Sequence, residues 1–246
     1  MLFRKMIFRK FQLRPSYCAF VACLAAFSLS FGGLQPVVIA QAHWTLEGVL
    51  NQLNKSSKSF QSLKADIEHT KVTVVVNDKS TESGQIFVQR DDKMRIEFIQ
   101  PDPRTILRTG NQVFIYNPKI KRVEEYDLGK HQSEVDQFLL LGFGTSGSEM
   151  EKGYKTEFLG EEELDKRLVL KLQLTPRSSE LQKQITKVII WIDETNWLPA
   201  QQQVFEAGSE DYLLMHYTNV ERNAHLSDNE FKPHWPKGVT RVKPEG

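Results

Sequence analysis

Residues 84–118, GQIFVQRDDKMRIEFIQPDPRTILRTGNQVFIYNP, decide the fold class of this chain. They hold four short runs of strand-forming residues, each ended by Asp, Pro, Gly or Asn, at residues 85–90, 93–100, 104–108 and 112–116. In the second run Met94, Ile96 and Phe98 alternate with charged residues. This period of two is typical of a strand with one buried and one solvent-exposed face. The turns between the runs are too short for crossover helices, so the sequence predicts an antiparallel meander.

Strand patterns continue on both sides of the meander. Before it, residues 44–63 show a helical pattern with Thr45 as a possible N-cap, and residues 64–76 form an expected strand that ends in a β-branched run. After it, alternate leucines from Leu168 to Leu174 and the apolar stretch 187–193 predict further strands. We expect about eleven strands in a mainly β (α+β) chain. An array of that length favours curling into a barrel or half-barrel.

One segment, residues 133–150, interrupts the strand pattern. Ser133 is suited to cap a helix whose first turn carries acidic residues, and an apolar block at 138–141 follows before glycines end the segment. This block is apolar on too many sides for a surface helix. We therefore expect it to pack against apolar surface on more than one side, or to slide over it.

The N-terminal 42 residues have the pattern of a secretory signal peptide. Five basic residues and no acid precede an apolar run, and cleavage is expected after Ala40 or Ala42. The expected mature domain, residues 43–246, loses both cysteines, so it has no disulfide or thiol chemistry. It keeps 27 basic and 31 acidic residues, a net charge of −4. Because the two signs are interleaved, the sequence predicts no nucleic-acid surface.

No group of residues in the sequence matches a catalytic motif. The six histidines are scattered without metal-ligand spacing, and no serine lies in a Gly-x-Ser-x-Gly motif, so no metal, cofactor or catalytic residue is expected. Residues 142–147, GFGTSG, match the G-x-G-x-x-G pattern. They follow a helical block rather than a strand and open no long helix, so a flexible hinge is a better interpretation than a nucleotide loop.

The unusual property of the chain is its amount of apolar side chain on strands. If one face of a curled sheet is exposed to solvent, the other, apolar face must be covered. The N-terminal helix and the 138–141 block can cover it. For any single residue a packed core is the simpler interpretation. The alternative is a cavity for an apolar ligand beneath a mobile lid.

The stretch 84–118 resembles the periplasmic outer-membrane lipoprotein carrier proteins, the LolA-like family. The resemblance rests on Gln100-Pro101-Asp102, Thr109-Gly110 and Tyr116-Asn117-Pro118, and it extends more loosely over the rest of the mature chain. It implies an incomplete antiparallel β-barrel of about eleven strands with a helical lid. It also implies a monomeric periplasmic shuttle for acylated lipoproteins, which an inner-membrane ABC-type complex releases and an outer-membrane acceptor receives.

The resemblance assigns residues to two roles. Arg90 corresponds to an arginine that hydrogen-bonds lid backbone and keeps the empty cavity shut, although pairing with Asp91 or Asp92 at the surface is the alternative. Asp91 and Thr109 depart from the family pattern beside this arginine. The residues expected to line the acyl cavity and its lid are Met94, Ile96, Phe98, Ile106, Phe138, Leu140 and Leu141.

Two other functions of the same barrel stay open at this stage. One is a lipid- or lipoprotein-sensing envelope protein that binds a partner without a shuttle role, although such proteins usually carry a second domain. The other is a scavenging protein for free fatty acids or glycolipids, which differs only in its cargo.

Overall fold

The computed structural model describes residues 44–90, 92–129 and 141–244. In these residues the chain forms one twelve-stranded sheet, ordered β12-β6-β5-β4-β3-β2-β1-β11-β10-β9-β8-β7. The bounds of the strands are β1 Ser62–Thr73, β2 Asp78–Gln89, β3 Lys93–Gln100, β4 Arg104–Thr109, β5 Gln112–Asn117, β6 Arg122–Asp127, β7 Tyr154–Leu164, β8 Arg167–Pro176, β9 Ile185–Asp193, β10 Pro199–Glu206, β11 Tyr212–Arg222 and β12 Thr240–Val242. Three helices are described, α2 Leu46–Ser59, α4 Gly147–Gly153 and α5 Ser179–Gln182, with 3-10 turns η1 Val74–Val76, η2 Pro118–Ile120 and η4 Asp228–Phe231.

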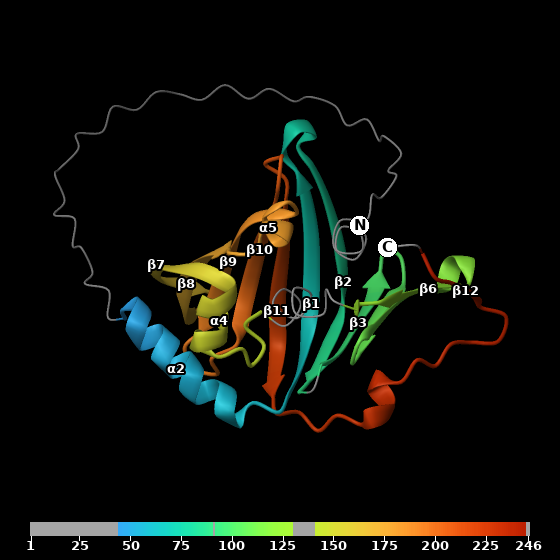
Figure 1. Cartoon of the computed structure of the whole chain (residues 1–246), viewed down its shortest axis with the longest axis horizontal. Coiled ribbons are helices and arrows are strands. Elements are labelled where there is room, and N and C mark those ends of the chain that lie inside the picture. The colour runs from blue at the N-terminus through green and yellow to red at the C-terminus, as the bar shows by residue number, and fades with distance from the viewer. Residues whose placement is uncertain (1–43, 91, 130–140, 245–246) are drawn as a thin grey trace, which may run out of the picture.

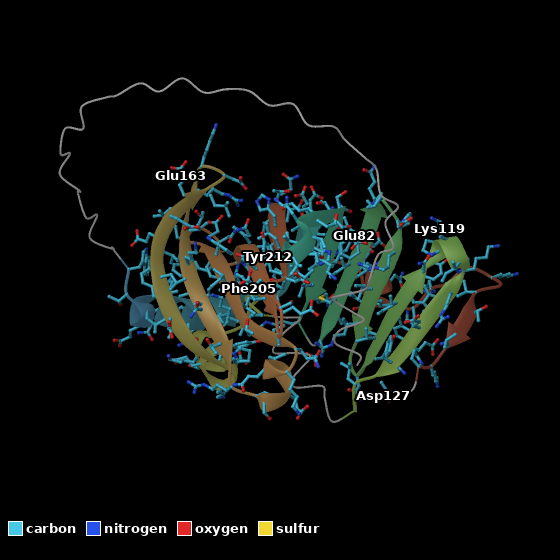
Figure 2. The ribbon with its side chains drawn as sticks, turned by 90° about the horizontal axis from the view of Figure 1, so that it is seen from above. Glu82, Lys119, Asp127, Glu163, Phe205 and Tyr212 are labelled. Atoms are coloured by element: carbon cyan, nitrogen blue, oxygen red, sulfur yellow. The ribbon has the colours of Figure 1, made fainter. Side chains whose placement is uncertain are left out.

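The sheet curls but does not close, so the expected incomplete barrel is confirmed. Strand β1 lies at its centre and pairs with both β2 and β11, which joins the two halves of the chain. Strands β7 and β12 form the two edges. Seen from above, Glu163 on β7 and Lys119 in η2 lie at opposite sides of the open sheet (Figure 2).

The meander has the predicted order, with three corrections around it. The strand expected over residues 64–76 ends at Thr73, and the valines that follow form η1 instead. Strand β2 begins at Asp78 rather than at residue 85, because β1 pairs with it along its whole length down to Thr73↔Asp78. The described sheet has one strand more than the expected eleven, since the short β12 in the tail adds to β6 in parallel.

Helices α2 and α4 cover the β7–β10 side of the concave face (Figure 1). Helix α2 begins where the sequence predicts, because the Thr45 side-chain oxygen accepts a hydrogen bond from the Gly48 amide at 3.1 Å. Its buried stripe packs against leucines of β8, of which all but Leu168 are buried. Leu168, which is 40% exposed, lies next to the first residue of β8.

Helix α4 was not expected from the sequence. Ser146 and Glu149 form a capping box at its start, in which each side chain accepts from the other residue's backbone amide. The helix expected from Ser133 lies outside the described residues. On the opposite, convex face, the tail packs Phe231 and Trp235 over β4–β6 (Figure 1). In the described parts of the chain, no helix is long and apolar enough to span a bilayer.

Candidate apolar ligand site

A small apolar cavity lies on the concave face, at the middle of the sheet. Its volume is about 40 Å³. Three of its lining residues, Met94, Ile96 and Leu141, are among those expected from the sequence. The sequence did not single out the other eight, which are Ile67, Ile86, Phe143, Val188, Gln202, Val204, Met215 and Tyr217.

Residues 141–146, which we call the strap, close this cavity on the side away from the sheet. Leu141 and Phe143 are both buried against the strands, and the ring of Phe143 meets Tyr217 edge-on at 5.3 Å. The amide of Gln202 donates to the Leu141 carbonyl at 2.6 Å and accepts from the Tyr217 hydroxyl at 2.9 Å. Burial raises the pKa of Tyr217, so this hydroxyl stays a neutral donor.

The glycines of GFGTSG are explained by close packing of the strap. A Cβ at Gly142 would lie 2.6 Å from Ile190, and one at Gly144 would lie 2.2 Å from Phe60. Gly147 lets the first turn of α4 approach the backbone of Leu50 in α2, where a Cβ would meet the carbonyl oxygen at 2.4 Å. Each glycine of the G-x-G-x-x-G match therefore has a packing role.

Phe98 and Ile106 lie on the same face but in a neighbouring cluster rather than in the cavity lining. They pack with Val113, Ile115, Tyr126 and Leu128, and Ile96 joins this cluster to the cavity. The expected apolar surface is thus continuous across β3, although only part of it faces the described cavity. Phe138 and Leu140, also expected at the site, lie outside the described residues.

A cluster of three polar side chains, Glu82, Arg104 and His69, borders the apolar surface beside Phe98. Glu82 accepts a hydrogen bond from Arg104 at 2.8 Å and lies 3.3 Å from the His69 ring nitrogen. The guanidinium of Arg104 lies 4.7 Å from the centre of the Phe98 ring. Burial opposes ionisation of Glu82, but the His69 hydrogen bond and the Arg104 charge outweigh it, so its pKa is lowered.

Arg90 binds a helix end. Its guanidinium donates to the carbonyl oxygens of Ser57 and Phe60, at the C-terminal end of α2. The expected target was lid backbone, and the described target is the helix that covers the concave face. Asp92, which was an alternative partner for Arg90 at the surface, forms an ion pair with Arg108 at 3.5 Å.

A second arginine, which the sequence did not indicate, binds the same helix end from β11. Arg222 donates to the Ser56 carbonyl at 2.6 Å and to the Ser59 hydroxyl at 3.2 Å. Its pKa is lowered, first by burial and then by the charge of Arg90. Two cations at a helix C-terminus complement the negative end of the helix dipole, which offsets their mutual repulsion.

A larger pocket of about 380 Å³ adjoins the cavity on the far side of the strap. Leu141 and Phe143 line both spaces, so the strap is the wall between them. The floor of the pocket is apolar and includes Val88 and Met150. Its rim carries charged side chains of both signs, from Arg90, Asp92, Glu149 and Lys152.

Comparison with known proteins supports the resemblance. Residues 58–234 match the family model described as outer membrane lipoprotein carrier protein LolA. An outer-membrane lipoprotein carrier protein from Dechloromonas aromatica (strain RCB) is 25% identical over 116 residues, which are 47% of this chain and 54% of that protein. The matched part therefore spans about half the length of this curated relative.

Solved structures resemble this chain at low sequence identity. An uncharacterized conserved protein from Thermus thermophilus superposes with a TM-score of 0.53 at 11% identity, over 80% of this chain and 98% of that one. A LolA superfamily protein from Nitrosomonas europaea gives a TM-score of 0.40 at 13% identity, over 77% and 98%. At 11% identity, the match to the Thermus thermophilus protein shows a shared fold and nothing more. The family model covers most of the chain, and the protein belongs to the outer membrane lipoprotein carrier protein LolA family.

Proposed function

We propose that this protein is an exported, periplasmic carrier that shields the acyl chains of lipoproteins and shuttles them from the inner to the outer membrane. The signal-peptide pattern of residues 1–42 supports export. Family membership supports lipoproteins as the cargo class. An inner-membrane ABC-type release complex and an outer-membrane acceptor are the partners that such a carrier requires.

The observation that carries the proposal is the apolar cavity beneath the strap. Ligand cavities typically hold about 300–1,000 Å³, whereas this one holds about 40 Å³. This cavity is therefore closed, and an acyl chain enters it only if the strap or α2 separates from the sheet. Gly144 of the strap packs against Phe60, the residue that caps the C-terminal end of α2, so the strap and the end of α2 lie in contact.

A carrier of this kind needs no chemical step. Each acyl CH₂ group that leaves water contributes about 0.8 kcal/mol, so a cargo with several chains stays bound to an apolar site until another apolar site replaces it. Arg90, which joins β2 to α2, then opposes opening and lowers the affinity for cargo. Handover becomes a transfer between apolar sites of graded affinity.

The first test is binding of a hydrophobic fluorophore and its displacement by an acylated lipoprotein. Ile96→Glu places a carboxylate in the cavity lining and should abolish binding, because an unpaired buried charge costs several kcal/mol. Ile99→Glu is the matched control, since Ile99 lies on the same strand but is 58% exposed. If a folded Ile96→Glu protein binds as the wild type does, the ligand lies elsewhere.

The second test separates a shuttle from an envelope protein that only binds or senses lipid. The protein is loaded with a radiolabelled lipoprotein and mixed with vesicles that contain an outer-membrane acceptor. A shuttle releases its cargo to these vesicles and retains it when the acceptor is absent. A protein that binds the lipoprotein but releases none to the acceptor is a binding protein without a shuttle role.

A further inference from the structure

The turn between β1 and β2 is apolar and fully at the surface. Val74, Val75 and Val76 are 37%, 88% and 68% exposed. Turns usually carry Gly, Asn, Asp or Ser, as other described hairpins of this sheet do at Gly110-Asn111 and Gly208-Ser209. Exposed apolar patches usually mark binding surfaces, so three consecutive exposed valines indicate that this turn binds something.

The β1–β2 hairpin projects beyond β3, whereas β11 runs beside β1 as far as Val72. Strand β2 pairs with β3 only from Ser83 onward, so residues 78–82 extend past that strand. Five residues of strand correspond to about 17 Å. In Figure 1 this hairpin forms the upper end of the sheet, with η1 at its tip.

The tip has a defined conformation. The Val74 amide donates to the Asp211 carboxylate at 2.9 Å, and the Asn77 amide donates to the Val74 carbonyl at 3.0 Å. Asn77 takes the left-handed conformation, with φ of 49°, that this turn requires. Valine side chains also have little rotamer freedom to lose, so the tip is preorganised for contact.

We infer that this valine tip inserts into the surface of a lipid bilayer. Three valines on a convex turn offer roughly a few hundred Å² of apolar surface, whereas specific protein interfaces bury about 1,200–2,000 Å². A bilayer needs no matching shape, and apolar side chains enter its interface by about 5–10 Å. The projection of the hairpin past β3 is longer than this depth, so the valines reach the acyl region before β3 meets the headgroups, with the β10–β11 turn beside them.

The tip has no excess of basic residues. Lys71 and Lys79 each lie three residues from the valines, and the acidic residues nearby are Asp78, Asp211 and its neighbour Glu210. The contact therefore depends on apolar insertion and does not need anionic lipid. It is independent of the proposed carrier function, because none of the three valines lines the cavity or the pocket beside it.

The test uses the exported protein with Cys18 and Cys23 replaced by Ser where they are retained, since these are the only cysteines. An NBD fluorophore is attached to Val75→Cys or, as the control, to Leu159→Cys on β7, where the native side chain is 48% exposed. With phosphatidylcholine vesicles, emission at position 75 should shift to the blue, and nitroxide lipids should quench it. Position 159 should not respond.

A second variant measures the strength of the contact. Val75→Asp/Val76→Asp should lower co-sedimentation with the same vesicles by roughly tenfold, while Leu159→Asp has no effect. Equal responses at positions 75 and 159, or none at either, would overturn the inference. A response at position 75 only when the vesicles contain membrane proteins would also overturn it, in favour of a protein partner.

Discussion

The side-chain nitrogen of Gln202 lies 2.6 Å from the backbone carbonyl oxygen of Leu141, in a buried part of the concave face. The other end of the same amide accepts a hydrogen bond from the Tyr217 hydroxyl. One side chain of β10 thus joins the strap to β11 in surroundings that are otherwise apolar. Because buried polar groups are costly when unpaired, this amide is a main attachment of the strap to the sheet.

Replacing this amide should destabilise the protein. Gln202→Leu leaves the Leu141 carbonyl and the Tyr217 hydroxyl buried without their partner, at about 1–3 kcal/mol for each group. We expect urea denaturation to show a loss of about 2–4 kcal/mol in the free energy of unfolding. Gln201→Leu, on the same strand but the other face, should change it by less than about 0.5 kcal/mol. Equal effects of the two substitutions would contradict this role of Gln202.

The glycines of the strap should be intolerant of a methyl group. Gly144→Ala combines a φ of +73° with a Cβ 2.2 Å from the Phe60 ring, so both backbone strain and a clash are expected. Gly110→Ala is the matched control, because its φ is +54° and nothing lies within 4 Å of its Cβ. Thermal denaturation of the control should reflect strain alone, about 1–2 kcal/mol. The loss for Gly144→Ala should exceed it clearly, and a smaller loss would refute the packing role.

Removal of the guanidinium of Arg90 should favour the open form. Arg90→Leu takes donors away from the end of α2, so the closed form loses stability and the apparent affinity for an apolar ligand rises, by roughly tenfold. Arg222→Leu should act in the same direction, since it binds the same turn. Both affinities are measured by fluorophore titration, and release of a lipoprotein to acceptor vesicles should slow.

The control for this prediction is another arginine at a helix end. Arg177 donates to the carbonyls of Glu151 and Tyr154 at the end of α4, at 3.0 and 3.2 Å. Arg177→Leu removes a similar set of hydrogen bonds without touching α2. An affinity increase as large as that of Arg90→Leu would show that general loosening, not the α2 contact, causes the effect.

Acid should reduce the stability that Glu82 contributes through its contacts with Arg104 and His69. The folded-state pKa of Glu82 lies below its ordinary value of 4.5, so ionised Glu82 stabilises the fold above that pH, and this stability is lost as the pH falls through the lowered value. Unfolding of the wild type and of Glu82→Gln should be compared from neutral pH to about pH 3. The difference between them should shrink on acidification, and a constant difference would exclude the carboxylate as the source.

The local architecture could be predicted from the sequence because short-range patterns specify it. The alternation of Met94, Ile96 and Phe98 placed these side chains on one face of β3, and Thr45 marked the start of α2. The β-branched residues at 72–76 misled the prediction, since valine favours strands by propensity while Asn77 and the Asp211 carboxylate hold a turn there. The start of α4 had a readable signal in Ser146 and Glu149.

The tertiary structure alone decided which apolar residues meet at the cavity. Gln202 and Leu141 are 61 residues apart, and Arg90 and Arg222 reach α2 from opposite halves of the chain. Nothing in a local pattern distinguishes Ile96, which faces the cavity, from Phe98, which packs in the neighbouring cluster beside Arg104. That difference arises because the curvature of the sheet and the path of the strap determine where space remains, and both depend on contacts between residues distant in sequence.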